Sequence, residues 1–145
     1  MSGRREATTA RHRAREAAFR VAYQAEIAGD GYAHAWKDHE DRARMSEDQL
    51  ELANDVIGHL ERHGADVDAA LQDAASHWPL DRMSATDRSV LRVAVAELIA
   101  RPGTPARVVI DEAVEIAKRY GAGESGGFVN GVLDRLARQL RPEEF

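Results

Sequence analysis

The stretch SATDRSVLRVAVAELIA, residues 84–100, is the most apolar segment of the chain and decides its fold class. Its apolar residues recur every three to four positions, which is the period of an α-helix. Ser84 and Asp87 form an acidic version of a helix-capping arrangement at its start, and the sequence Pro-Gly-Thr-Pro at residues 102–105 ends it. We expect so apolar a helix to lie at the centre of the structure, with other helices packed around it.

The segments on both sides of this stretch also follow the helical period, and none shows the sustained two-residue alternation of a β-strand. Gly29 and Gly64 are expected to end two of the helices, and Ser46 with Gln49 forms a capping box. The pattern predicts an all-α protein, a single domain of about seven helices in two packed sub-bundles that meet near residues 76–84. The expected helices begin at or near Thr8 or Thr9, Tyr32 (a short helix to Arg44), Ser46, Asp66, Ser84, Pro105 and Ser125.

Length and composition limit the classes of protein that the chain can belong to. It has 145 residues, no cysteine and a formal net charge of −5. A domain of this length can bury enough apolar surface to fold unaided, and the lack of cysteine excludes disulfides and thiolate metal sites. No run approaches the ~20 apolar residues that span a bilayer, and the arginine-rich start has no apolar core like that of an export signal. We therefore expect a cytoplasmic protein without a membrane partner.

The charge is distributed unevenly along the chain. Residues 1–20 hold six arginines and two glutamates, so this segment is basic while the rest of the chain is acidic. Such asymmetry is typical of a basic arm directed at an anion, and a solvated tail followed by a charged helix face is the alternative. We expect a flexible basic arm over residues 1–10, a helical domain over 11–140 and a C-terminal tail over 141–145.

Two motifs of enzymes overlap in the glycine-rich segment. Residues 121–126 spell the dinucleotide fingerprint G-x-G-x-x-G, and residues 123–127 spell the nucleophile motif G-x-S-x-G. Both motifs require a preceding β-strand, whereas a helix is expected here, and the last histidine, His77, precedes Ser125 instead of following it. We expect no catalytic residue, no enzyme activity and no cofactor. A glycine-rich turn before a helix does suit a phosphate, because its backbone N–H groups are unpaired.

Four other residues can be interpreted in two ways. His59 and His63 have the spacing of two metal ligands on a helix, but no third ligand is evident, so surface histidines and no metal site are expected. Trp78 before Pro79 is more typical of a packing residue than of a stacking platform. Phe128 in the first turn of the last helix can either enter the core or stack on an unpaired base, and the sequence leaves both open.

Several segments of the chain resemble the NusB family, and they follow one another along the sequence in the order found in that family. The final run, FVNGVLD at residues 128–134, is the most family-specific of them, and the resemblance extends from about residue 11 to residue 137. The other segments that carry it are residues 13–17 and 22–24, 78–83, 87–92 and 96–98, 105–118, Gly121 and Ser125.

The resemblance implies an RNA-binding adaptor that acts in an antitermination complex on bacterial RNA polymerase. It implies binding to the boxA element of ribosomal RNA leaders together with NusE, a ribosomal protein, in support of rRNA transcription and processing. Tyr23 and Asp87 would contact NusE. Arginines of the basic arm and two segments of the domain would contact RNA, namely Arg4, Arg5, Arg11, His12, Arg13, Arg15, Glu124, Ser125 and Phe128.

The sequence departs from the family at a few positions, and two other functions compete. Ala96 replaces a frequent tyrosine, Asp111 a common asparagine, Glu124 the usual aspartate, and glycines 126 and 127 replace residues that are often polar or basic.

A NusB-like domain also forms the N-terminal part of an RNA methyltransferase family, so a fragment of such an enzyme is one alternative. A self-associating helical bundle, such as a homodimer formed through the RNA face, is the other.

Overall fold

The computed structural model describes residues 2–145, with the side chains of residues 10–145, and every regular element in this part of the chain is a helix. The prediction of an all-α fold is therefore confirmed. The elements are α1 (Ser2–Ala28), α2 (Tyr32–Lys37), η1 (Glu40–Arg44), α3 (Glu47–Ala74), η2 (Leu80–Arg82), α4 (Ala85–Ala100), α5 (Ala106–Tyr120), α6 (Ser125–Leu140) and η3 (Pro142–Glu144), where η denotes a 3₁₀ helix.

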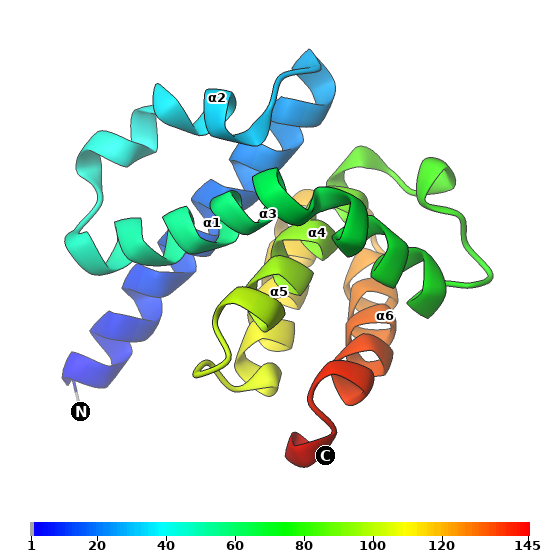
Figure 1. Cartoon of the computed structure of the whole chain (residues 1–145). Coiled ribbons are helices and arrows are strands. Elements are labelled where there is room, and N and C mark those ends of the chain that lie inside the picture. The colour runs from blue at the N-terminus through cyan, green and yellow to red at the C-terminus, as the bar shows by residue number, and fades with distance from the viewer. Residues whose placement is uncertain (1) are drawn as a thin grey trace.

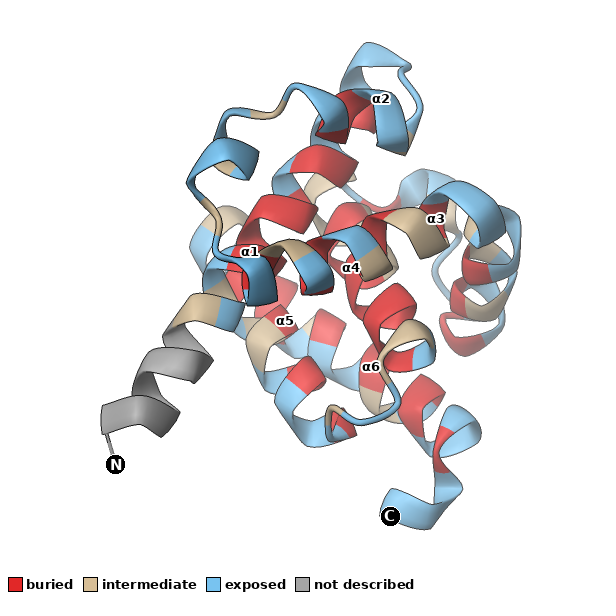
Figure 2. Ribbon diagram, turned by 60° about the vertical axis from the view of Figure 1, so that its left-hand side comes forward, coloured by how far each residue is buried: buried red, intermediate tan, exposed pale blue. Residues whose placement is uncertain are grey.

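Helix α4 lies at the centre of the molecule, as its sequence predicts. It packs against α1, α3, α5 and α6, and its buried residues face these neighbours (Figures 1 and 2). The Ser84 side chain accepts the backbone N–H of Asp87 at 3.0 Å, so the predicted cap is present. Helices α1–α3 form one part of the fold and α4–α6 the other, with residues 75–84 between them (Figure 1).

Six α-helices are observed over residues 2–145 where about seven were expected, because α3 covers both the third and the fourth expected helix. The capping box of Ser46 and Gln49 starts it, but Gly64 does not end it. The helix bends instead at His63, whose φ and ψ are −131° and 25°. Gly29, by contrast, has a φ of 73° and follows the end of α1 as predicted. A glycine ends a helix when its backbone enters the left-handed region, and Gly64 does not.

The first two expected helices also differ from the structure at their ends. Helix α1 begins at Ser2 instead of Thr8 or Thr9, so the backbone before residue 10 already belongs to this helix. The side chains of Arg4 and Arg5 lie outside the described residues. The expected short helix over residues 32–44 is divided into α2 and η1. Within the described residues, no helix combines the length and the hydropathy that crossing a bilayer requires.

Residues 141–145, expected to form a tail, instead close the junction between α4 and α5. The buried Arg141 guanidinium donates to the carbonyls of Leu98 at 2.8 Å and Arg101 at 3.1 Å, and also to that of Thr104. Glu144 pairs with Arg141 at 3.0 Å. One Glu144 oxygen accepts the first N–H of α5 at 2.8 Å, and this bond together with Arg141 lowers the pKa of Glu144. We call these five residues the C-terminal clasp.

Candidate nucleic-acid interface

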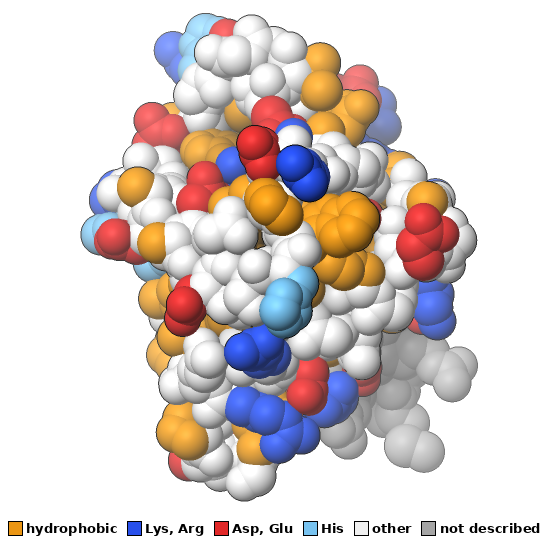
Figure 3. Space-filling model, turned by 90° about the vertical axis from the view of Figure 1, so that its right-hand side faces the viewer, with side chains coloured by type: hydrophobic (Ala, Val, Ile, Leu, Met, Phe, Trp, Pro, Cys, Tyr) orange, Lys and Arg blue, Asp and Glu red, His pale blue; other side chains and the backbone are white. Residues whose placement is uncertain are grey.

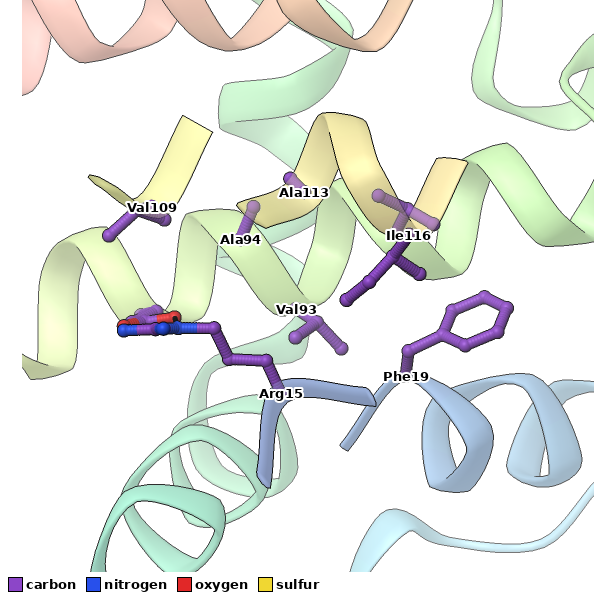
Figure 4. A pocket seen from close by; sticks show the side chains of 9 residues that line it. Arg15, Phe19, Val93, Ala94, Val109, Ala113 and Ile116 are labelled. Carbon is purple, nitrogen blue, oxygen red and sulfur yellow. Dashed lines mark hydrogen bonds and ion pairs between the residues drawn. The ribbon is translucent and has the colours of Figure 1, made fainter. Parts of the chain in front are cut away.

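Arg15, expected at the RNA surface, is part of a buried ion pair between α1 and α4. Its side chain is 4% exposed and that of Glu97 is 1% exposed. The Arg15 Nε and Nη2 groups donate to the Glu97 carboxylate at 2.7–3.0 Å. Figure 4 shows Arg15 extending from α1 in a crevice whose other walls are apolar side chains of α4 and α5. Because its charge is already neutralised by Glu97 in the core, the geometry favours a structural role for Arg15, and its RNA contact stays a prediction.

Two other predicted arginines of α1 are exposed. Arg11 Nε lies 3.5 Å from an Asp48 carboxylate oxygen, and both side chains are about half exposed. Such a pair is worth at most about 1 kcal/mol, so a phosphate can compete for Arg11. Arg13 has no ion-pair partner within the described residues and lines a hollow between α1, η1 and α3 together with Arg20 and Arg44 and with the acids Glu16 and Asp41. Both Arg11 and Arg13 are exposed and therefore accessible to a ligand.

His12 lies between two carboxylates and joins α1 to α5. Its Nε2 atom is 3.3 Å from Glu16, and its Nδ1 atom contacts Glu112. Glu16 in turn accepts the Tyr120 hydroxyl at 2.9 Å and pairs with Arg119 at 3.0 Å. The two carboxylates already occupy both nitrogens of His12, so RNA would have to displace one of them.

Ser125 closes the glycine-rich loop on itself, so the hydroxyl that was predicted to contact RNA is already bonded within the protein. Ser125 is 2% exposed, and its Oγ accepts the N–H of Ala122 at 3.0 Å. It is the first residue of α6 and does not cap that helix, since the N-cap residue is Glu124. A Cβ at Gly121 would lie 2.6 Å from the Ser125 Oγ, so only glycine fits there. The Ser125 hydroxyl holds the loop, whereas Glu124 is exposed beside it.

Helix α5 separates the two parts of the predicted RNA site. Glu112, which contacts His12, lies on α5, and Gly121 directly follows the last residue of that helix. The nine positions from Glu112 to Gly121 correspond to about 13 Å along a helix axis. The loop lies between helices α5 and α6, so neither enzyme motif has the strand that it requires. The contact of His12, which lies between Arg11 and Arg13 on α1, is therefore with the middle of α5, whereas the loop before α6 follows the end of that helix.

Phe128 lies at the edge of the core and contacts Trp78. The Phe128 ring is half-buried, which falls between the two alternatives that the sequence left open. Its centroid is 6.4 Å from that of Trp78, and the ring planes are inclined by 62°. Trp78 was expected to be a packing residue, but it is 53% exposed. The face that carries the end of α3 and α6 has an exposed hydrophobic patch with a histidine and several Lys or Arg side chains nearby (Figure 3).

The two residues expected to bind the partner protein lie on adjoining elements. Tyr23 on α1 is exposed, and three residues later Glu26 pairs with Arg88, the neighbour of Asp87 on α4. The Oδ1 atom of Asp87 is buried and has no hydrogen-bond partner within the described part of the chain. Ile27 is 63% exposed and extends the apolar surface of Tyr23 by one helical turn. Sequence reasoning missed Ile27, although its spacing of four from Tyr23 was a usable signal.

No cluster of three or more histidine, cysteine, aspartate or glutamate side chains suited to a metal occurs among the described residues. The rings of His59 and His63 are 4.9 Å apart, and the nearest paired acid is Asp66, 3.9 Å from His63. Burial, followed by the charge of His63, lowers the pKa of His59. These two histidines thus lie as neighbours along one face of α3.

Comparison of the sequence with known proteins gives a consistent result. The sequence model of the NusB family matches residues 12–138. Transcription antitermination protein NusB of Anaeromyxobacter dehalogenans (strain 2CP-1) is 42% identical over 139 residues, which cover 93% of this chain and 95% of that protein. The protein of the same name from Sorangium cellulosum (strain So ce56) is 43% identical, with coverages of 90% and 94%.

Solved structures of similar proteins have the same fold. T. maritima NusB matches with a TM-score of 0.84 and 35% identity, covering 93% of this chain and 96% of that one. A crystal structure of the antitermination factors NusB and NusE in complex with double-stranded RNA contains a chain that matches with a TM-score of 0.80 and 28% identity, with coverages of 90% and 98%.

Proposed function

The chain belongs to the NusB family, and from this premise we propose that it is a transcription antitermination adaptor that binds boxA-type RNA together with NusE. The observation that carries the proposal is the similarity of nearly the whole chain to antitermination proteins, one of which has been crystallised with NusE and RNA. The adaptor would support rRNA transcription and processing within the cytoplasmic RNA polymerase complex. Its role is to join partners, and no catalytic step is part of the proposal.

We propose a smaller RNA surface than the sequence predicted. Arg11 and Arg13 would neutralise phosphates, because both are exposed and neither has a strong partner among the described residues. Beyond the end of α5, the first turn of α6 would favour a phosphate because it is a helix N-terminus, and Phe128 would stack on an unpaired base. Glu124, exposed beside them, would accept a hydrogen bond from a base amino group.

The NusE surface would combine Tyr23 and Ile27 of α1 with Asp87 of α4. Supporting this, the ion pair of Glu26 and Arg88 joins α1 to α4 beside Tyr23, and Asp87 is partly exposed, although its Oδ1 atom is buried. A partner seated there would gain apolar area from two exposed side chains and one directional hydrogen bond.

Replacing Arg13 with alanine is expected to weaken RNA binding across sequences and to flatten its salt dependence. Removing one phosphate contact with single-stranded RNA lowers the slope of log K against log salt concentration by about 0.7. The measurement is a titration of labelled boxA-type RNA at several salt concentrations, with Arg62→Ala, an exposed arginine of α3, as the matched control. An unchanged slope in the Arg13 variant would remove this residue from the interface.

RNA and NusE are expected to bind with positive coupling, because the two proteins together present one continuous surface to the RNA. A typical coupling of about 1–3 kcal/mol would tighten RNA binding by about 5- to 150-fold, and RNA would tighten NusE binding by the same factor. The check is the RNA titration repeated with saturating NusE. Tyr23→Ala should weaken the coupling and leave binding to RNA alone unchanged. Equal RNA affinity with and without NusE would contradict the adaptor function.

A further inference from the structure

The two tryptophans of the chain have opposite environments. Trp36 is 4% exposed, and its Nε1 donates to Asn54 at 2.7 Å, as expected of a core residue. Trp78 is the most exposed aromatic side chain among the described residues, although burial of a tryptophan ring stabilises a fold more than burial of most side chains. An exposed ring of this size therefore invites a role in binding.

The loop that carries Trp78 is held in place by hydrogen bonds on both sides of the ring. The Trp78 N–H donates to the Ala75 carbonyl at 2.9 Å, and the next N–H, that of Leu80, donates to the Gln72 side chain at 3.0 Å. Arg88 then donates to the carbonyl of Leu80 at 2.7 Å and to that of Met83 at 2.8 Å. These hydrogen bonds fix the backbone of the loop before a ligand binds. Binding to the Trp78 ring would therefore carry only a small entropic cost for ordering the loop.

The contact with Phe128 makes the two rings one surface. The ring centroids are 6.4 Å apart in an edge-to-face arrangement, and since Trp78 is 53% exposed and Phe128 half-buried, part of each residue remains accessible to a flat group. An apolar partner surface would suit a purely apolar patch, whereas here the Lys118 side chain lies against Gly126, two residues before Phe128, and His77 directly precedes Trp78. Aromatic rings among cationic groups are the usual surface for unpaired bases, since every base has a π face and every nucleotide a negative charge.

We propose that Trp78 is a second base-stacking residue, which forms with Phe128 a platform for two unpaired bases of the bound RNA. This inference rests on the proposed RNA-binding function. Two bases that stack on planes inclined by 62° are not parallel to each other, so the RNA strand turns at this point and the two bases separate.

The first test is the affinity for a labelled single-stranded boxA-type RNA. Trp78→Ala is expected to weaken binding by about 5- to 150-fold without changing the salt slope, because stacking is lost and no charge is removed. Trp78→Phe should retain most of the affinity. Trp78→Leu, which keeps apolar bulk at the contact with Phe128 but lacks a π face, should behave like the alanine variant. Leu140→Ala removes an exposed apolar side chain on α6 and is the matched control.

The second test measures intrinsic tryptophan fluorescence during RNA binding. If Trp78 had only a structural role, adding RNA would not change its emission. Unlabelled RNA should quench the emission of the wild type and leave that of Trp78→Phe unchanged, because the remaining Trp36 is buried. Wild-type affinity in Trp78→Leu, or absence of quenching while RNA is bound, would overturn the inference. So would a Trp78→Ala defect confined to NusE binding.

Failure of this inference is distinguishable from failure of the proposed function. If Phe128→Ala weakens RNA binding at unchanged melting temperature and Trp78→Ala does not, only the second stacking residue is refuted. If the wild type binds no boxA-type RNA, with or without NusE, the proposed function is refuted and the inference with it.

Discussion

Glu97→Ala is expected to lower the free energy of unfolding by about 3–5 kcal/mol, because it leaves the Arg15 guanidinium charged, buried and without its partner. Arg15→Ala should have an effect of similar size, since it leaves the Glu97 carboxylate in the same condition. Both losses would appear in urea unfolding followed by circular dichroism. Arg11→Ala, which changes an exposed arginine one turn before Arg15 on the same helix, should cost less than about 1 kcal/mol and is the control.

The double variant Arg15→Met, Glu97→Leu separates the structural role of this pair from a role in RNA binding. Replacing a buried ion pair by apolar residues of similar volume is often neutral or stabilising, so most of the lost stability should return. The refolded double variant should bind boxA-type RNA with the wild-type salt slope. A slope lower by about 0.7 in a stable double variant would show that Arg15 contacts a phosphate after all.

Arg141→Ala is expected to lower the free energy of unfolding by about 2–4 kcal/mol. The buried guanidinium is shared by three carbonyls at the end of α4 and in the turn that follows it, and hydrogen bonds to a charged donor are each worth about 1.5–3 kcal/mol. In the variant, all three carbonyls would lose their hydrogen-bond donor at the same time.

Thermal unfolding of Arg141→Ala beside two controls tests this prediction. Arg138→Ala, an exposed arginine one turn earlier, should change the melting temperature little. Glu144→Gln keeps an oxygen for the N–H of Ala106 and should fall between the two. Equal melting temperatures for Arg141→Ala and the wild type would mean that the C-terminal clasp does not stabilise the junction of α4 and α5.

The helical fold could be predicted because the signals that specify it are local. Ser46 and Ser84 cap their helices in the predicted way, and the apolar spacing of residues 84–100 identifies the central helix. Gly64 was misjudged because a glycine only permits a break. The residues that follow it, among them Val67 and Leu71, are buried in the same core, and their packing continues the helix through a bend.

The RNA site could be predicted only in part, because exposure depends on which face of a helix meets its neighbours. Arg15 is spaced by four from the buried Phe19, and Glu97 lies in the most apolar helix of the chain. Together these two positions indicate a buried pair. The local sequence pattern, however, does not show that α1 and α4 pack against each other. The bond of Ser125 to Ala122 could not be predicted for a similar reason, since it depends on how the loop folds.

The sequence separation of 82 positions between Arg15 and Glu97 also bears on how the protein reaches its native state. Contacts between distant residues require closure of a long loop, which costs conformational entropy, so we expect α1 to dock on α4 late in folding. An interaction made after the transition state leaves the folding rate almost unchanged and slows unfolding. We therefore expect variants of this pair to unfold faster than the wild type while they fold at nearly the same rate.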